Sequence, residues 1–434
     1  MFLNVTLLLL AGLLVVLMQA GFGLVITGMC RAKNAGQVVS TNLVIFAFSV
    51  LGFWVCGFAL MAAVWPGIPG ASGFTGGHWY FLHGTEPAVL GRFFFQAALI
   101  AVAAVIPAGA MAERWKFSNV IPFGFFFSAV PLAVYGRWVW GGGWLSNLGS
   151  SLGLGHGFVD FGGSSVIHMA GGVIGFMGAM ALGPRIGKYA RDGRPRPMPG
   201  HNLVYVIVGT ILLAVGWLGF NMGPEVFRGG ERAPLIAVNT LLAAVAGAAS
   251  SYGVVIMKFR KPDPSMVCNG LLAGLVAISA SCAFVNPVGA VITGAIAGIL
   301  VVYSVLFFEG TLKVDDPMGA LSVHGVSGAW GIISLGLLAN GGSEPAGTGV
   351  CGAFGEIFGG AKNDWSQLGA QIVGAATCFL FFVAVGWGWF KVCTIFGPLR
   401  SRHEDEIAGL DLPEMGAECY PDFHLTDKGS TRAE

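Results

Sequence analysis

The chain has 434 residues, of which 55% are hydrophobic and only 10% are charged, and its formal net charge is +1. A soluble domain normally carries about 25% charged residues, so this composition excludes an ordinary soluble protein, and the balanced charge gives no case for binding nucleic acid. The eight cysteines are scattered, without CxxC or Cys/His metal spacing. We therefore expect neither a disulfide framework nor a metal site.

Eleven apolar runs of about 20 residues follow one another along the chain, each long enough to cross about 30 Å of hydrocarbon as a helix. The first run has no basic segment before it and no clear cleavage site, so it is interpreted as a span rather than a signal peptide. Strands of a membrane barrel would need alternating segments of about 10 residues, and this reading is rejected. The sequence predicts an all-α integral membrane protein with spans at 3–28, 42–64, 91–111, 118–136, 163–183, 203–221, 234–257, 269–285, 287–308, 319–339 and 368–395.

Basic residues fall very unevenly on the two sides of the predicted bundle. Of the 23 Lys and Arg residues, 18 lie in one set of alternate connecting segments, and the other set holds only Arg92, Arg137, Arg228, Arg232 and Lys362. Loops rich in Lys and Arg stay in the cytoplasm. The N-terminus is therefore predicted outside and the C-terminus inside, as an odd number of spans requires.

Two long outer segments and one polar tail interrupt the pattern of spans. Residues 65–90 and 341–367 are rich in Gly, Pro and aromatic residues and are interpreted as ordered caps over the mouth of a bundle. The chain from about residue 398 is polar and too short for a kinase or nucleotide-binding module. We divide the chain into a transmembrane domain, 1–397, and a cytoplasmic tail, 398–434.

A histidine stands in the same glycine frame in two of the spans. Around His168 the chain reads VIHMAGGVIG and around His324 it reads SVHGVSGAWG, with glycines four and seven residues after each histidine. Those glycines lie on the same helix face as the histidine and let a neighbouring backbone approach. The two spans are the fifth and the tenth, which indicates an inverted repeat of helices 1–5 and 6–10 with a peripheral eleventh helix. Inverted repeats place their site near the bilayer midplane, where we expect the two histidines to meet.

The histidine pair favours a carrier over an enzyme. Ionisable residues inside a membrane bundle tend to line pathways or to pair with one another, so function is favoured here over simple packing. The sequence has no nucleophile elbow, Walker loop, HExxH motif or dinucleotide fingerprint, and we expect neither catalysis nor a cofactor. A neutral imidazole donates at one nitrogen and accepts at the other, which suits a small polar molecule or a cation that sheds its proton.

Asp160 is the acidic residue that stands at the start of the fifth span. It precedes His168 by eight residues, a distance of about 12 Å along a continuous helix. Two compatible roles stay open for it. Its carboxylate caps the helix N-terminus, or it helps to hold a cation near the outer mouth.

At these residues the chain resembles the ammonium transporter family (Amt/Mep/Rh), and within it the Amt branch. The likeness covers essentially the whole chain, because its motifs follow in family order and spacing. The motifs are AGFGLVITGMCRAKN, FFFQAA, GAMAERWKFS, WVWGGGWL, VDFGGSSVIH, GHNLVYVIVGT, GWLGFN, VDDPMGALSVHGVSGAWG and EDEIAGLDLPEMGAECYPDF.

The resemblance implies a homotrimer in the cell membrane with one pore in each subunit. Ammonium is recruited at an external vestibule, deprotonated and moved as ammonia past paired histidines, with net transfer of a proton or charge. His168 and His324 match the twin histidines, and Asp160 matches the aspartate below the recruitment site. Trp140 matches the vestibule aromatic that holds ammonium by cation–π attraction, and Phe220 matches the inner phenylalanine of the gate.

Several positions depart from the family pattern. The outer gate phenylalanine falls on Leu99, and the vestibule serine falls on Pro224. The glutamate of the first-helix signature falls on Ile26, and Pro107 interrupts the third span, where we expect a kink. These changes predict weaker vestibule binding than in typical relatives and leave the histidine-lined pore intact.

The tail resembles the regulatory segment of the family, with Gly409, Leu410 and Asp411 in its GLD motif. The resemblance implies that this segment couples the subunits and meets a PII-type signal protein that plugs the inner mouth. Met415 replaces the histidine found five residues after the leucine, which weakens that implication. The alternative interpretation of the segment is a solvated, partly disordered tail.

Two alternatives to a transporter stay open. The first is an ammonium receptor that binds its ligand and signals through the tail without useful flux. The altered vestibule favours it, and the lack of a fused signalling module opposes it. The second is a neutral-gas or water channel on an unrelated fold, which the collinear motifs oppose.

Overall fold

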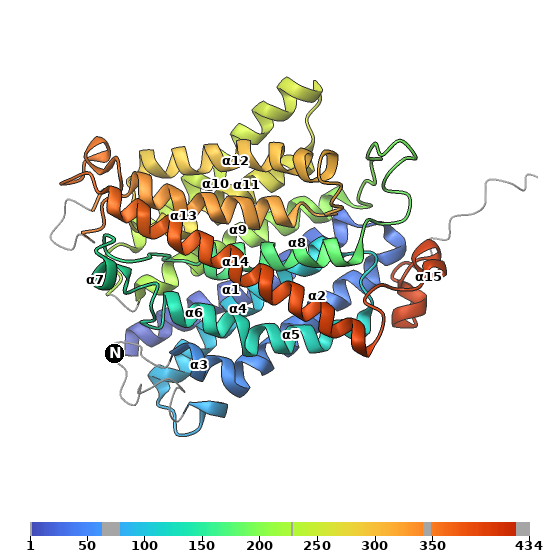
Figure 1. The fold of residues 1–434 in the computed structure, drawn as a ribbon, viewed down its shortest axis with the longest axis horizontal. Coiled ribbons are helices and arrows are strands. Elements are labelled where there is room, and N and C mark those ends of the chain that lie inside the picture. The colour runs from blue at the N-terminus through green and yellow to red at the C-terminus, as the bar shows by residue number, and fades with distance from the viewer. Residues whose placement is uncertain (1, 63–78, 227–228, 342–348, 422–434) are drawn as a thin grey trace, which may run out of the picture.

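The computed structural model describes residues 2–62, 79–226, 229–341 and 349–421, and all eleven predicted spans are present as helices. Within these ranges the extended pairings are three isolated β-bridges, so the predicted all-helical fold is confirmed. The spans run along the long axis of the molecule, with the short helix α7 (Leu148–Leu152) at one end and α15 (His403–Ala408) at the other (Figure 1).

Seven of the spans are single α-helices, and four are built from shorter pieces. The single helices are α1 (Phe2–Met29), α4 (Pro87–Met111), α9 (Leu203–Val226), α10 (Ala233–Phe259), α11 (Pro264–Ser281), α12 (Pro287–Gly310) and α14 (Trp365–Phe396). The second span joins η1 (Ala32–Asn34), α2 (Ala35–Gly52), η2 (Phe53–Gly57) and α3 (Phe58–Ala62), and the fourth joins η4 (Phe117–Asn119), α5 (Val120–Ala129) and α6 (Pro131–Val139). Outside the spans lie η3 (Tyr80–Leu82), η7 (Gly355–Phe358) and η8 (Asp411–Met415).

The fifth and the tenth spans share an unusual construction. Each begins with a π-helical turn, η5 (Ser164–Met169) before α8 (Ala170–Leu182) and η6 (Leu321–Val326) before α13 (Ser327–Leu338). Such turns are rare and recur at functional sites. Each of these two turns carries one of the histidines singled out from the sequence, His168 in η5 and His324 in η6.

The second span begins about ten residues earlier than predicted. Residue 42 was expected to be its start, but η1 begins at Ala32, because the polar side chains of this stretch are buried in protein instead of facing lipid. Gln37 donates a hydrogen bond to the carbonyl of Trp115 (3.1 Å), and Asn42 donates one to the carbonyl of Gln19 (3.2 Å). Hydropathy alone cannot detect polar residues that are satisfied in this way.

The two prolines in the middle of spans act differently. Pro131 begins α6 and so divides the fourth span in two. By contrast, α4 continues through Pro107 to Met111, and a bend of this helix stays a prediction. Proline lacks an N–H group, so the carbonyl of Ala103 loses its helical donor. A Cβ at Gly171 of α8 would lie 2.8 Å from that oxygen, so the neighbouring helix packs tightly at this point.

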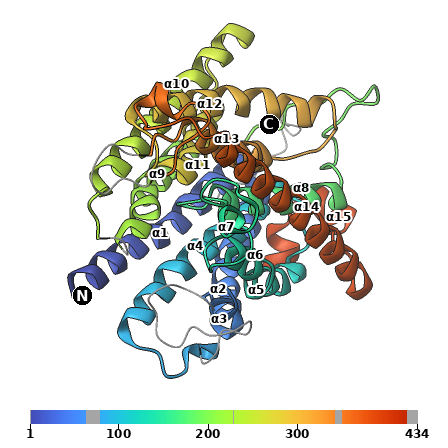
Figure 2. The same ribbon diagram turned by 60° about the vertical axis from the view of Figure 1, so that its left-hand side comes forward.

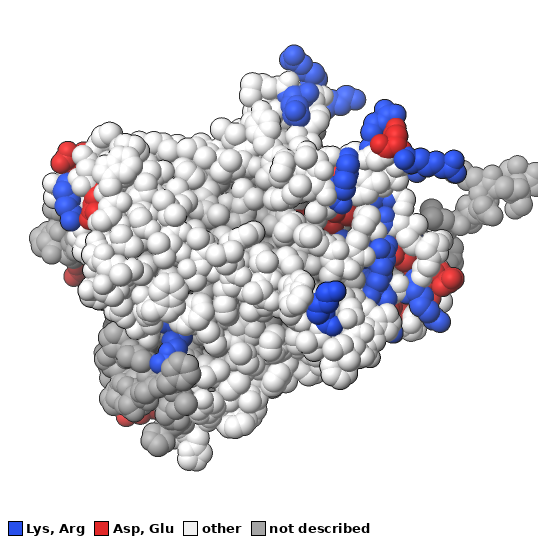
Figure 3. All heavy atoms as spheres, in the orientation of Figure 1, with Lys and Arg blue, Asp and Glu red and all other residues white. Residues whose placement is uncertain are grey.

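The surface of the bundle is that of a membrane protein. Most of its long sides are almost free of charged side chains, whereas Lys and Arg gather toward the end that holds α15 (Figure 3). Helix α14 crosses diagonally over the outside of the bundle (Figures 1 and 2).

Candidate functional site

Two histidines meet inside the bundle, as their glycine frames predicted. His168 and His324 face each other with their Nδ1 atoms 3.2 Å apart, and their ring planes are inclined by 19°. Both side chains are buried, with exposed fractions of 0% and 5%. A hydrogen bond between two Nδ1 atoms requires one ring to donate and the other to accept, so the two imidazoles take complementary roles.

The glycines of the two frames lie where the two spans cross. A Cβ at Gly172 would overlap the backbone nitrogen of Gly325, and a Cβ at Gly328 would lie 2.5 Å from the carbonyl oxygen of Ser164. Any larger side chain would hold the two π-helical turns apart, because backbone atoms cannot rotate out of the way. Glycine at these positions therefore allows the close approach of the two histidines.

Asp160 caps the turn that carries His168. One carboxylate oxygen accepts from the amide of Gly163 (3.0 Å), and the other accepts from the amide and hydroxyl of Ser165 (2.8 and 2.6 Å) and the amide of Val166 (3.0 Å). Burial raises the pKa of the Asp160 carboxyl, and these hydrogen bonds oppose the rise. Of the two roles left open from the sequence, the cap is the one that the geometry displays.

No continuous helix joins Asp160 to His168, so the distance of about 12 Å worked out for that case does not apply. Helical structure begins at Ser164, because Gly163 has a φ angle of +98°, in a region that favours glycine. The chain before it is an irregular turn, and Asp160 reaches forward from that turn to the first amides of the helix. The side chain therefore lies beside the helix N-terminus and not within the helix.

Asp316 occupies the same position before His324, and the sequence analysis missed it. It precedes His324 by eight residues, as Asp160 precedes His168. Its carboxylate accepts from the amides of Leu321 (2.7 Å) and Met318 (3.3 Å) at the start of η6. Burial raises the pKa of this carboxyl as well, against the effect of its hydrogen bonds. The repeated spacing D-x7-H was visible in the sequence and would have identified the residue.

Aromatic rings surround the histidine pair. Trp217 and Phe220 stack on His168 with ring centroids 4.9 and 5.3 Å away, and Phe22 lies 6.1 Å from His324. Phe220 therefore lies directly beside the pair, and its role in a gate stays a prediction. The Nε2 atom of His168 is buried and has no hydrogen-bond partner among the residues that the structure describes. The pair is therefore surrounded by aromatic rings, and the Nε2 atom of His168 remains available for a hydrogen bond.

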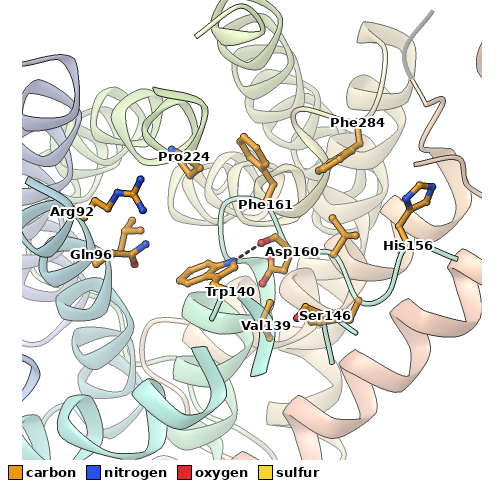
Figure 4. Close-up of a pocket in the computed structure, with 13 residues that line it drawn as sticks. Arg92, Gln96, Val139, Trp140, Ser146, His156, Asp160, Phe161, Pro224 and Phe284 are labelled. Atoms are coloured by element: carbon orange, nitrogen blue, oxygen red, sulfur yellow. Dashed lines mark hydrogen bonds between the residues drawn. The ribbon is translucent and has the colours of Figure 1, made fainter. Parts of the chain in front are cut away.

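A cavity of about 510 Å³ opens toward the end of the bundle that carries α7, and we call it the outer cavity (Figure 4). Four residues singled out from the sequence line it together: Leu99, Trp140, Asp160 and Pro224. Sequence reasoning missed the others, which are Arg92, Gln96, Val139, Ser146, His156, Phe158, Val159, Phe161 and Phe284. Val159 and Phe161 flank Asp160 in the chain, and Val139 precedes Trp140, so adjacency to a predicted residue was the signal available for these three.

Four aromatic rings line the outer cavity, those of Trp140, Phe158, Phe161 and Phe284. Trp140 is fixed by a hydrogen bond of 2.6 Å from its Nε1 to the carbonyl oxygen of Asp160 (Figure 4). Phe161 and Phe284 lie edge to face, with centroids 5.8 Å apart and an interplanar angle of 85°. Aromatic faces attract cations through their negative quadrupole, so the cavity keeps ring faces although Leu99 supplies none.

Leu99 and Pro224 lie in the cavity wall as predicted, and neither offers a ring face or a hydroxyl. Pro224 stands in the last turn of α9, which continues to Val226. Phe220 stands one turn earlier on the same helix, where it stacks on His168 and is absent from the cavity wall. The outer cavity and the histidine pair are therefore adjacent along α9.

A second cavity, the inner cavity, lies on the other side of the pair and holds only about 30 Å³. Its wall is apolar apart from His324 and Asn269, and the Asn269 amide donates to the carbonyl of Met318 (3.3 Å). Ile26 lies in this wall, so the position that matches the family glutamate faces the inner cavity. The structure thus shows a wide outer cavity and a narrow inner one, with the histidine pair between them.

The first part of the tail packs against the inner end of the bundle. Gly409 has a φ angle of +120°, and a Cβ there would lie 2.6 Å from the carbonyl oxygen of Lys33. The Leu410 amide donates to the side chain of Asn34 (2.9 Å). The Asp411 carboxylate accepts from the amides at residues 36 and 37 (3.0 and 2.8 Å), at the start of α2. Each residue of the GLD motif therefore has a defined contact, which contradicts a fully solvated tail up to residue 421.

A buried ion-pair network lies close to the docked tail. Arg185 joins Glu113 (3.0 Å) to Asp315 (2.8 Å), and all three side chains are at most 3% exposed. Arg31 also pairs with Glu113. Burial acts to raise the pKa of Asp315, but the hydrogen bonds and charge of Arg185 outweigh it and lower that pKa to about 2.

Comparison with known proteins agrees with this arrangement. The model of the Ammonium Transporter Family matches residues 6–420. The chain is 41% identical to ammonium transporter Amt2 of Archaeoglobus fulgidus over 424 residues, which cover 96% of this chain and 88% of the relative. It is 32% identical to the ammonium transporter of Bacillus subtilis, over 94% of this chain and 96% of the relative.

Solved structures lead to the same family. A sensor Amt protein superposes with a TM-score of 0.84 at 32% identity, over 95% of this chain and 98% of that one. Mep2 of Candida albicans superposes with a TM-score of 0.77 at 25% identity, over 96% and 90% of the two chains. Together with the eleven membrane helices, these matches identify a multi-pass protein of the cell membrane, and the chain belongs to the ammonium transporter family.

Proposed function

We propose that this chain takes up ammonium by binding it in the outer cavity, removing its proton there and conducting ammonia past His168 and His324. The observation that carries the proposal is the buried histidine pair, whose Nδ1 atoms are 3.2 Å apart and which lies between two cavities. A pair of imidazoles at this depth is costly unless it serves a pathway. The open Nε2 position of His168 is where a small polar molecule would bind.

The outer cavity suits recruitment of a small cation. Its wall holds four rings, those of Trp140, Phe158, Phe161 and Phe284, and one cation–π contact is worth about 0.5–2 kcal/mol. The cavity is wide enough to leave water on the ion, so little desolvation is needed at this stage. Binding here concentrates ammonium at the start of the path without committing it to the apolar interior.

Deprotonation before the histidine pair follows from the cost of burying charge. An ion that passed Phe220 would lose its water among apolar rings, at a cost of several kcal/mol. Neutral ammonia needs only a donor and an acceptor, and the two imidazoles offer both. The proton goes first to water in the outer cavity and then to the imidazole pair, which accepts and releases protons in turn. Transport of ammonia is therefore accompanied by the movement of a proton, and so of net charge, across the membrane.

Asp160 acts as a positioning residue in this scheme. Its carboxylate holds the first amides of η5, the turn that carries His168, and its carbonyl oxygen holds the Trp140 ring. One residue thereby fixes a ring of the outer cavity and a histidine of the pore relative to each other. Direct contact with the cation is not required of its carboxylate.

The same proposal includes the architecture implied by the sequence. An inverted repeat of the first five spans and the next five is supported by two observations. The fifth and tenth spans both begin with a π-helical turn. Asp160 precedes His168 by the same number of residues as Asp316 precedes His324. The gathering of basic side chains near α15 supports an outer N-terminus and a cytoplasmic C-terminus (Figure 3).

The division into a membrane domain, 1–397, and a regulatory tail, 398–434, is part of the proposal, together with the homotrimer and the PII-type partner at the inner mouth. The docked GLD motif supports a regulatory role for the tail, because Asp411 fixes the start of α2. A segment held by a few hydrogen bonds can detach more readily than a span.

An ammonium receptor is the second candidate. The observations that favour it are the likeness to a sensor Amt protein over 95% of the chain and the altered cavity wall at Leu99 and Pro224. A receptor would bind ammonium in the outer cavity and pass the signal to the tail with little flux.

Currents on a solid-supported membrane separate the two candidates. The protein is reconstituted in liposomes and given an ammonium pulse, with protein-free liposomes as the control. A sustained current that depends on the protein supports transport. Binding by calorimetry without any such current would reject transport in favour of the receptor.

A further inference from the structure

Two polar side chains of α4 point into the outer cavity and have no place in the scheme so far. Arg92, Gln96 and Leu99 all line the cavity, and their spacing of four and three residues puts them on one helix face. The guanidinium of Arg92 and the carboxamide of Gln96 lie side by side on this wall, facing the same space as Trp140 (Figure 4). One is a cation, and the other can accept a hydrogen bond.

Gln96 offers a buried acceptor in this wall, in addition to the partly exposed hydroxyl of Ser146 and the imidazole of His156. It is 6% exposed, and its Oε1 has no hydrogen-bond partner among the described residues. The carboxylate of Asp160 already accepts four hydrogen bonds, its carbonyl oxygen accepts from Trp140, and Pro224 has no hydroxyl. An acceptor buried without a donor is costly, and rotation of the amide by half a turn presents the oxygen to the cavity without a change of shape.

Arg92 acts on a bound cation in the opposite direction. A guanidinium stays charged at any physiological pH. For a cation about 8 Å away across a cavity of this size, with an effective dielectric constant of about 20, repulsion lowers the affinity about 30-fold. His156 is the other basic side chain in the wall, and Asp160 is the acidic one. The carboxylate of Asp160 accepts hydrogen bonds from the amides at the start of η5, so its negative charge is already partly balanced there.

We propose that Gln96 and Arg92 set the affinity of the outer cavity for ammonium in opposite directions. Gln96 accepts a hydrogen bond from the bound ion in place of the hydroxyl that Pro224 lacks, and Arg92 weakens the binding of every monovalent cation. The neutral ring faces and the single amide then favour an ion with N–H donors over an alkali ion. This inference rests on the proposed function, since it concerns the site at which ammonium is recruited.

The test compares half-saturating ammonium concentrations for the current of the full-length protein in liposomes. Gln96→Leu removes the acceptor and should raise this concentration about tenfold, the effect of one hydrogen bond to a charged partner. Arg92→Gln should lower it about 10- to 30-fold, because salt screens part of the repulsion, and Gln96→Glu should lower it as well. Lys362→Gln is the matched control, because it removes an exposed positive charge outside the cavity wall and should change nothing.

The outcomes separate this inference from the proposed function. If the parent gives a current and Gln96→Leu shares its half-saturating concentration, the acceptor role is overturned while transport stands. If Arg92→Gln leaves that concentration unchanged or raises it, the repulsion is overturned. If the parent gives no current, transport itself fails, and calorimetry of ammonium binding to the same variants applies the same criteria. A variant that does not reach the unfolding temperature of the parent is replaced by Gln96→Met or Arg92→Met, with the same expected directions.

Discussion

Replacing Gly328 by alanine tests whether close packing sets the distance between the histidines. The new Cβ would lie 2.5 Å from the carbonyl oxygen of Ser164, and an ordinary van der Waals contact of 3.4 Å would require the backbones to separate by about 0.9 Å. Ser164 resists movement, because its hydroxyl donates to the carbonyl of Val276 (2.7 Å) and accepts from the amide of Ala280 (2.7 Å). If the shift reaches His324, the distance between the Nδ1 atoms rises from 3.2 Å to about 4.1 Å, beyond hydrogen-bond range.

Overpacking of this kind costs about 1–3 kcal/mol of unfolding free energy, and we expect the ammonium-evoked current to fall with the loss of the paired geometry. Thermal unfolding in detergent and currents in liposomes measure the two effects. Gly388→Ala on α14 is the matched control, because a Cβ there meets nothing within 4 Å. A Gly328→Ala protein with the unfolding temperature and current of the control would refute the reasoning.

Three further predictions concern the outer cavity, the ion-pair network and the tail. Trp140→Leu removes one cation–π contact of about 0.5–2 kcal/mol, so calorimetry should find ammonium binding weaker by about 2- to 30-fold; unchanged binding would remove Trp140 from the site. The depressed pKa of Asp315, about 2, means that its pairing with Arg185 stabilises the fold above about pH 4 and is lost as the pH falls through about 2. Asp315→Asn should therefore cost about 2–3 kcal/mol at pH 7 and less than about 0.5 kcal/mol at pH 2 in unfolding experiments, and an equal loss at both pH values would contradict this. Gly409→Ala should release the tail and speed its proteolysis, because the new Cβ would lie 2.6 Å from the Lys33 carbonyl oxygen. Gly416→Ala is the control, because Gly416 also has a positive φ angle (+72°) but a Cβ there meets nothing within 4 Å, and this variant should not speed proteolysis.

The membrane helices could be predicted from the sequence because every span must cross the same thickness of hydrocarbon with apolar side chains. Runs of about 20 apolar residues predicted all eleven helices, and the rule failed where protein replaces lipid as the surroundings. The second span was predicted to begin ten residues too late, since Gln37 and Asn42 are polar but hydrogen-bonded inside the bundle. Asp160 lies outside the helix of the fifth span, because Gly163 has a positive φ angle and helical structure begins only after it.

The histidine pair could be predicted because it is repeated in the sequence. Two matching frames around His168 and His324 indicated a contact that no single motif would have indicated. The same comparison carried further would have found Asp316, eight residues before His324.

The wall of the outer cavity could be predicted only in part. Arg92 and Gln96 stand in an ordinary apolar span, and Phe284 lies in a connecting segment far from Trp140 in the chain. Which of these side chains share a cavity depends on how α4, α6 and α9 pack together, and that information is absent from local sequence patterns.

The central claim is that ammonia passes along the histidine pair, and the most direct test is the current of the double variant His168→Ala/His324→Ala. The parent and the variant are reconstituted at equal density and given the same ammonium pulse on a solid-supported membrane. The account predicts a sustained current from the parent and none from the variant, while calorimetry still detects ammonium in its intact outer cavity. A correctly folded variant that carries the current of the parent would contradict the account.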